Sequence, residues 1–240
     1  MQRLMFFTVI MTVSFANADI LKFSPRLGVF DSGVINIDLD YATCNDMKWD
    51  AEEIIPSKTK IFYTLKCLEI EYDSGTTFYH IIVIIDKIIE DKNIINGPFV
   101  MYAVAKNNGA LSFWKGINNS YRSINLLSKL LQPLAMSFYY PNDDLDQIVM
   151  WSKKYNWPRK SEFEMTFNGD FYIKQYNSKT VDVKNDVYFV LKELNGHITS
   201  NYTINRKFSS IDELKARCTL RYDIEDDRIV LFLDIYKGEE

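Results

Sequence analysis

Alternation of apolar and polar residues is the dominant pattern along this chain. Residues 34–41 (VINIDLDY) carry an apolar side chain at every second position, with Asp38 and Asp40 on the other face. Residues 61–72 also alternate, but the polar positions change phase near Cys67, which predicts a β-bulge there. A period of two is typical of strands that bury one face, so the chain is predicted to be rich in β-structure.

Short turn motifs separate several of the predicted strands. Asp73-Ser74-Gly75 leads into residues 77–85 (TFYHIIVII), an almost continuous apolar run that is typical of a central strand covered on both faces. Four further hairpins are predicted where turn-forming residues lie between apolar runs. Their centres are residues 107–109, 168–170, 195–196 and 225–227. Local turns of this kind predict antiparallel pairing of successive strands.

Helical spacing is less common in this sequence. Apolar residues three and four positions apart, or a good capping residue ahead of them, mark each predicted helix. Ser210 and Glu213, for example, have the spacing of a capping box. The predicted helices are residues 121–132, 145–155, 211 to about 218, and a short segment at 47–55.

These elements predict a mainly β protein of the α+β class. The expected architecture is an antiparallel β-sandwich, or a pair of twisted sheets of hairpins, with about three short helices packed on one side. The domain is expected to be single. An alternative division has two β-rich halves that meet around residues 121–160.

The first eighteen residues have the order of a secretory signal peptide. Arg3 precedes an apolar run at residues 4–15, and Ala16-Asn17-Ala18 forms a small-x-small cleavage site. Twelve apolar residues are too few to span a bilayer. We therefore expect residues 1–18 to be removed and residues 19–240 to form a secreted, extracellular domain.

Composition narrows the range of partners. The chain has 28 basic and 32 acidic side chains and a formal net charge of −4 at pH 7. This balance argues against nucleic acid, which is bound by clustered Lys and Arg. No further apolar run is long enough to span a membrane, and no phosphate-binding or dinucleotide motif predicts a cofactor.

The predicted export makes disulfide formation and N-glycosylation relevant to this chain. In an oxidising compartment, Cys44 and Cys67 are the pair nearest in sequence and are predicted to form a disulfide. Cys218 is then left over, either as a buried, inert thiol or as the partner of a cysteine in another chain. Two histidines and no Cys-x-x-Cys spacing predict no metal site. Asn118 and Asn201 begin N-glycosylation sequons.

His80 and His197 are the only histidines and the weak candidates for catalysis. His197-Ile198-Thr199 has the His-x-Thr pattern that two-histidine phosphoesterases use in pairs, with the imidazoles as acid and base. The motif at His80 has Ile82 in place of the hydroxyl residue, so half of the pattern is missing. Ordinary strand positions explain both histidines more simply than catalysis.

An acidic face is the stronger candidate for binding. If the strands at 34–41 and 61–72 pair, one exposed sheet face collects carboxylates from both of them. The residues concerned are Asp38, Asp40, Glu69 and Glu71. Such a face would attract a basic extracellular protein and speed its association. Trp157, in a loop before Pro158, is the best exposed aromatic candidate for an interface.

Three functions follow from these observations. The leading interpretation is a secreted, non-enzymatic protein that binds another extracellular protein through a β-sheet face. The second is a carrier that holds a small apolar ligand, such as a lipid, between sheets, in a cavity lined by residues 77–85 and 121–134. The third is a phosphoesterase-like hydrolase built on the two histidines.

Overall fold

Strands make up nearly all of the regular structure. The computed structural model describes residues 20–50, 56–116, 134, 140, 143–145, 148–156, 165–191, 194–224 and 227–238. The strands in these ranges are β1 (Ile20–Leu21), β2 (Gly28–Cys44), β3 (Met47–Trp49), β4 (Lys58–Asp73), β5 (Thr76–Glu90), β6 (Asn93–Lys106), β7 (Leu111–Lys115), β8 (Asp143–Asp144), β9 (Met150–Asn156), β10 (Met165–Tyr176), β11 (Thr180–Leu191), β12 (Leu194–Asn205), β13 (Ile211–Ile224) and β14 (Asp227–Gly238).

One large antiparallel sheet contains most of these strands. Its order is β7-β6-β5-β4-β2-β14-β13-β12-β11-β10-β9, and β3 pairs with β2 outside this path. Two runs of sequential hairpins therefore meet where β2 pairs with β14. This pairing joins the beginning of the described chain to its end. The short strands β1 and β8 form a separate pair.

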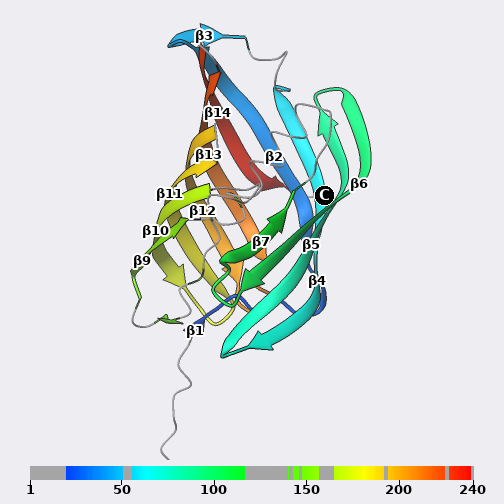
Figure 1. Cartoon of the computed structure of the whole chain (residues 1–240), viewed down its shortest axis with the longest axis vertical. Coiled ribbons are helices and arrows are strands. Elements are labelled where there is room, and N and C mark those ends of the chain that lie inside the picture. Colours follow the sequence, from blue (N-terminus) through cyan, green and yellow to red (C-terminus); the bar gives the residue numbers. More distant parts are fainter. Residues whose placement is uncertain are drawn as a thin grey trace, which may run out of the picture.

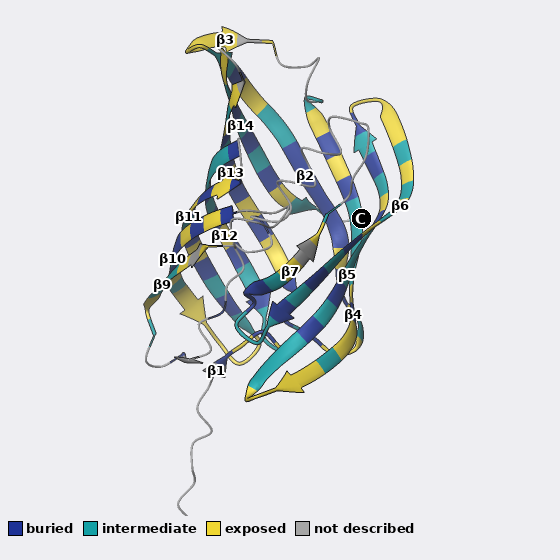
Figure 2. Cartoon of the chain, viewed as in Figure 1, coloured by how far each residue is buried: buried dark blue, intermediate teal, exposed yellow. Residues whose placement is uncertain are grey.

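The sheet is strongly curved (Figure 1). Strands β4 to β7 and strands β9 to β12 turn toward the same side, with β2 and β14 between them. Buried and exposed positions alternate along many of the strands in Figure 2, β10 and β11 among them, as a sheet with one covered face requires. Among the described residues, forty buried apolar side chains form a single core cluster, which includes Phe167, Val183 and Phe189 in one arm of the sheet and Ile81, Met101 and Ala103 in the other.

The predicted sandwich with three helices is wrong. A single curved sheet supplies the core, and within the ranges that the structure describes only Leu134 has helical backbone. Residues 211–218 belong to strand β13, residues 150–155 of the predicted second helix lie in β9, and residues 47–49 form β3. The predicted helix at 121–132 lies outside the described residues.

Strand β13 shows why local helix signals misled. Ser210 and Glu213 have capping spacing, but the longer pattern from Leu214 to Leu220 buries every second residue. Pairing with β12 and β14 satisfies the backbone of this segment on both sides. Neighbouring strands therefore decide its conformation, since helix propensity is easily overridden by tertiary context.

The turn predictions had mixed success. The bulge near Cys67 is confirmed by a register shift between Cys67 and Glu69, and the turn at Ser74-Gly75 joins β4 to β5. The hairpins centred at 107–109 and 225–227 are also confirmed, as β6 pairs with β7 and β13 with β14.

Two of the predicted turns are instead parts of strands. Asn168-Gly169-Asp170 lies inside β10, and Asn195-Gly196 lies inside β12. In both cases a glycine faces phenylalanine rings. A Cβ at Gly196 would lie 2.1 Å from Phe189 Cζ, and one at Gly169 would lie 3.0 Å from Phe171 Cε2. These glycines make room for core aromatics and do not reverse the chain.

Candidate functional site

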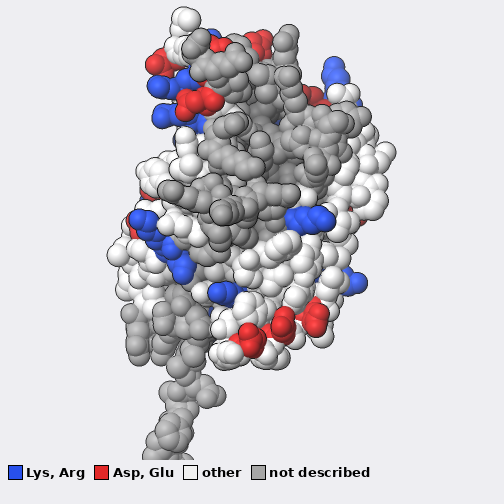
Figure 3. Space-filling view, in the orientation of Figure 1, with Lys and Arg blue, Asp and Glu red and all other residues white. Residues whose placement is uncertain are grey.

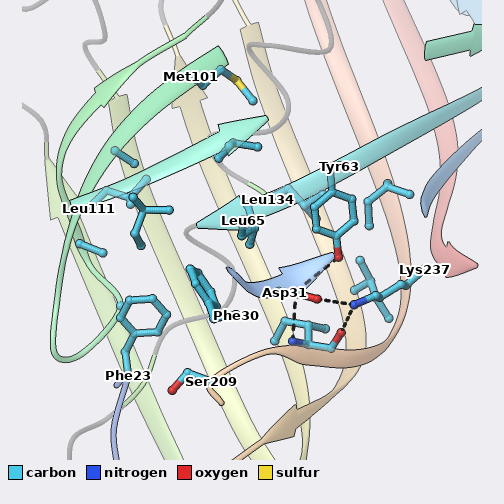
Figure 4. A pocket seen from close by; sticks show the side chains of 18 of the residues that line it. Phe23, Phe30, Asp31, Tyr63, Leu65, Met101, Leu111, Leu134, Ser209 and Lys237 are labelled. Atoms are coloured by element: carbon cyan, nitrogen blue, oxygen red, sulfur yellow. Dashed lines mark hydrogen bonds and ion pairs between the residues drawn. The ribbon is translucent and has the colours of Figure 1, made fainter. Parts of the chain in front are cut away.

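A cavity on the concave side of the sheet is the candidate functional site (Figure 4). Its volume is about 160 Å³. Most of its wall comes from β2, β4, β5, β6 and β7, and Leu134 and Tyr140 lie against it from outside the sheet. The described side chains around it are mainly apolar, so this space favours an apolar occupant.

Alternation along the strands explains the apolar wall. Ile81, Val83 and Ile85 point into the cavity from β5, and the neighbouring β6 presents Met101, Ala103 and Ala105. The two alanines are 2 % exposed and lack the bulk to fill the space in front of them. The cavity therefore exists partly because small residues stand where a tightly packed core would carry larger ones.

Aromatic rings close one side of this space. Phe23 packs edge-on against Phe30 and Tyr79, with ring centroids 6.2 and 5.4 Å away, and lies 5.5 Å from the ring of Tyr140. The Tyr140 hydroxyl donates a hydrogen bond to the backbone oxygen of Ser209 at 3.3 Å. Complete burial raises the pKa of Tyr140 above its ordinary value, so this hydroxyl stays protonated.

A small polar cluster, formed by Asp31, Tyr63, Lys237 and the backbone of Ile211, lies at another part of the wall. Lys237 Nζ is 2.6 Å from both Asp31 Oδ1 and the backbone oxygen of Ile211. Asp31 Oδ2 accepts from the Tyr63 hydroxyl at 3.3 Å and from the Ile211 amide at 3.4 Å. The Asp31 and Lys237 side chains are only 7 % and 12 % exposed, so this ion pair is largely removed from water.

The strand order and a β-bulge bring these groups together. Strand β2 lies between β4 and β14; Tyr63 is opposite Gly33 on one side, and Lys237 is opposite Ile35 on the other. A Cβ on Gly33 would come within 2.9 Å of Lys237 Cε, so the glycine leaves room for the lysine stem.

The bulge falls between Val29 and Asp31 and shifts the register by one residue. Phe30 and Asp31 can therefore both face the cavity although they are consecutive in the chain.

Burial dominates the electrostatics of the polar cluster. It raises the pKa of Asp31, although the Lys237 ammonium and three hydrogen bonds act in the opposite direction. Burial and the nearby Asp31 carboxylate raise the pKa of Tyr63, so its hydroxyl remains a donor. The ion pair is neutral as a unit, and the cavity wall carries no net charge from it.

The acidic residues predicted to form one face lie at opposite ends of the molecule. Asp38 on β2 is opposite Lys58 at the start of β4, whereas Glu69 and Glu71 lie beyond the region in which β4 pairs with β2. The distance along β4 from Lys58, which is opposite Asp38, to Glu69 is roughly 35 Å, at about 3.3 Å per strand residue. In Figure 3 acidic side chains are visible at both ends of the face shown.

Each half of that acidic set has local partners. Asp38 Oδ2 accepts from the Tyr236 hydroxyl at 3.2 Å, and Asp40 is exposed at a bulge in the pairing of β2 with β14. Glu71 Oε2 lies 3.0 Å from His80 Nε2. The structure therefore does not collect the four carboxylates on one surface.

The two histidines are also kept apart. His80 is on β5 and His197 on β12, and four strands separate β5 from β12 in the sheet. β12 is therefore the fifth strand from β5, and at about 4.8 Å per step the two histidines lie about 24 Å apart when measured along the sheet. His197 Nε2 is 2.6 Å from Asp186 Oδ1 and its ring stacks on Tyr188, while Thr199 is opposite Asp186 in the strand pairing. Each imidazole has its own carboxylate partner, Glu71 for His80 and Asp186 for His197.

The predicted disulfide is not formed. Cys44 is opposite Ile229 at one end of β2, and Cys67 is opposite Gly28 at the other end. A disulfide requires Cα atoms within about 7 Å, far less than the length of this strand. Cys44, Cys67 and Cys218 are all thiols in the structure, and burial raises the pKa of Cys67 and Cys218.

The remaining predicted sites are only partly covered by the structure. Asn201 is exposed on β12, where its Oδ1 accepts from Lys174 Nζ at 2.5 Å, so its side chain faces solvent as a glycosylated asparagine must. Asn118, Trp157 and the predicted signal peptide at 1–18 lie outside the described residues. Glycosylation and export stay predictions.

The residues of the polar cluster were not found from the sequence. Asp31 is a lone acid between apolar residues, Gly28-Val29-Phe30 before it and Gly33-Val34 soon after it. This apolar setting was the signal in the sequence that could have identified it as a buried carboxylate. Nothing local identifies Lys237 as its partner, because the two residues are far apart in the chain. Ile81, Val83 and Ile85, by contrast, belong to the predicted apolar run at 77–85.

Over the described residues, no helical segment has the length and apolar character to cross a lipid bilayer. A scan of family models, a search of curated proteins and a search of solved structures each found no match to this chain.

Proposed function

We propose that this protein binds a small apolar molecule in the cavity on the concave side of its sheet. The observation that carries the proposal is the cavity itself, about 160 Å³ of space lined mainly by aliphatic and aromatic side chains. An apolar cavity of about this size is known to stay dry and to hold a molecule the size of benzene.

The physical argument is that an empty apolar cavity is costly to a protein. Its lining atoms lose dispersion contacts, and water gains too few hydrogen bonds there to fill it. A ligand that enters restores those contacts and removes its own apolar surface from water at roughly 25 cal/mol per Å². After the loss of translational freedom, we expect dissociation constants on the order of 10 µM to 1 mM for a molecule of eight heavy atoms.

The lining favours binding over catalysis. Asp31 and Lys237 are the charged residues among the described lining, and each is already bound to the other. A nucleophile with its own general base, which hydrolysis of a bound ligand would need, is not assembled among them. A carrier or sensor that holds a small molecule is the function that this site supports.

This proposal replaces the acidic surface as the centre of the protein's function. Asp38 and Asp40 lie far from Glu69 and Glu71, so a basic protein would meet them as two separate pairs. The expected secretion of the chain remains compatible with a carrier, since a soluble exported domain can shield an apolar molecule from water.

Calorimetric titration of the purified protein with ethylbenzene tests the proposal. We expect saturable binding with one site per chain and a negative heat-capacity change, which is the mark of apolar burial. Native mass spectrometry of the freshly purified protein adds a second readout, a co-purifying mass that is lost on denaturation. Absence of ethylbenzene binding at millimolar concentration would overturn the proposal.

A matched pair of variants locates the binding. Ala103 lines the cavity, whereas Ala42 is equally buried in β2 but is not part of the lining. Ala103→Leu should fill the cavity, abolish ethylbenzene binding and leave the free energy of unfolding unchanged or increased. Ala42→Leu should cost roughly 1–3 kcal/mol through overpacking and leave binding intact. Equal destabilisation by both variants would show that the cavity is already filled.

A further inference from the structure

We infer that the ligand is an uncharged molecule with one hydrogen-bond acceptor, which the Lys237 ammonium binds while the apolar remainder lies among the rings and aliphatic side chains. This inference rests on the proposed function and specifies the chemical class of ligand. It follows from the donors, the charge balance and the position of the polar cluster.

Lys237 has a donor to offer. An ammonium group carries three N–H donors. Two of them have acceptors 2.6 Å away, Asp31 Oδ1 and the backbone oxygen of Ile211. Nζ also lies over the ring of Tyr63, 5.6 Å from its centroid, but no third oxygen or nitrogen acceptor for it is seen within the described part of the chain. Lys237 is itself part of the cavity lining. A ligand oxygen at this end of the cavity would satisfy the third donor.

Tyr63 does not compete for that role. Its hydroxyl proton is directed to Asp31 Oδ2, at 3.3 Å, and burial holds it in the protonated form. The Ile211 amide is likewise directed to Asp31. The Asp31 carboxylate is therefore well supplied with donors, while the ammonium is short of acceptors. The cluster is suited to a ligand acceptor and not to a ligand donor.

Charge balance selects an uncharged acceptor. The carboxylate and the ammonium already compensate each other in a largely buried setting. A carboxylate ligand at Lys237 would place a second negative charge close to Asp31 and leave the cavity with an uncompensated charge, which is expensive at low dielectric. A ketone, aldehyde or ester oxygen makes the same hydrogen bond without that cost.

The shape of the cavity orients the molecule. Lys237, Asp31 and Tyr63 lie together in Figure 4, and Phe23 and Leu111 lie on the opposite side of the space in this view. A ligand with its oxygen at Lys237 would direct its apolar end toward these two side chains. Acetophenone, which differs from ethylbenzene by one carbonyl oxygen, has the required form.

The experiment compares ethylbenzene, acetophenone and benzoate by calorimetry at pH 7.4, with the wild-type protein and with Asp31→Asn/Lys237→Met. The double variant removes both charges and keeps an acceptor at position 31 for Tyr63 and Ile211. We expect it to lower the ratio of acetophenone to ethylbenzene affinity about tenfold or more, which is the scale of a hydrogen bond to a charged donor. Benzoate should bind the wild-type protein more weakly than acetophenone does.

A second measurement does not depend on the variant. The carbonyl stretching band of acetophenone should move to lower frequency in the complex with the wild-type protein, as a bond to an ammonium predicts. An unshifted band, an affinity ratio unaffected by the double variant, or tighter binding of benzoate would overturn this inference while ethylbenzene binding still supported the proposed function. Failure of both ethylbenzene and acetophenone to bind would remove the proposed function as well.

Discussion

Lys237 Nζ lies 2.6 Å from Asp31 Oδ1, which ties a residue near the end of the chain to one near its beginning. The contact spans the junction of β2 with β14, where the two runs of hairpins meet. It is also the most polar part of the cavity wall. The same ion pair is therefore expected to influence both the stability of the sheet and the choice of ligand.

Removing one partner of this pair should be far more harmful than removing both. Asp31→Asn or Lys237→Met alone leaves a buried charge without its counter-charge, and we expect each to lower the free energy of unfolding by about 3–5 kcal/mol. Asp31→Asn/Lys237→Met leaves no such charge and should lie within about 1 kcal/mol of the wild type. Urea denaturation of the four proteins measures this coupling. Additive losses in the double variant would contradict the pairing seen in the structure.

The pH dependence of stability should carry the signature of Asp31. Burial raises its pKa above the ordinary value of 3.8, so the folded protein retains the proton to a higher pH than the unfolded chain does. The free energy of unfolding should therefore fall, relative to Asp31→Asn/Lys237→Met, as the pH rises from 3.8 through the folded-state pKa. Urea denaturation of the wild type and of the double variant between pH 3 and 8 gives the difference between their free energies of unfolding. Titrations that the two proteins share cancel in this difference. A difference that grows in favour of the wild type as the pH rises would contradict the raised pKa.

Gly196 should be intolerant of even a methyl group. It is opposite Phe189, whose ring is 2 % exposed and would lie 2.1 Å from an added Cβ. Gly196→Ala should cost roughly 1–3 kcal/mol because the ring must move within a packed core. Combined with Phe189→Leu, the same substitution should cost less than it does alone, since leucine vacates the space over position 196. Thermal unfolding of this double-mutant cycle measures the effect; equal costs in both backgrounds would exclude the contact.

The three cysteines should react as thiols at two different rates. Cys44 is half-buried, while Cys67 and Cys218 are buried and have raised pKa values, which leave little reactive thiolate. A thiol reagent at pH 8 should therefore modify one cysteine rapidly in the folded protein and all three after denaturation without reductant. An intact mass 2 Da below that of the reduced chain would reveal a disulfide and contradict this prediction.

The amino-acid sequence by itself determined the local β-structure in several places. The strand predicted at residues 34–41, the change of phase at Cys67 and the turn at Ser74-Gly75 each appear in the structure. The burial predicted for the first of these does not alternate, since residues 33–37 of β2 are all buried and Tyr41 is exposed. The apolar run at 77–85 likewise contains three residues of the cavity wall.

Tertiary structure alone decided the rest. Strand pairing on both sides made residues 211–218 a strand in spite of a capping signal. Gly196 and Gly169, which the sequence placed in turns, are strand positions that leave room for the rings of Phe189 and Phe171. The ion pair of Asp31 and Lys237 depends on β2 lying beside β14. Local patterns report only which face of an element is buried, whereas the distance between residues remote in the chain depends on the order in which the strands assemble.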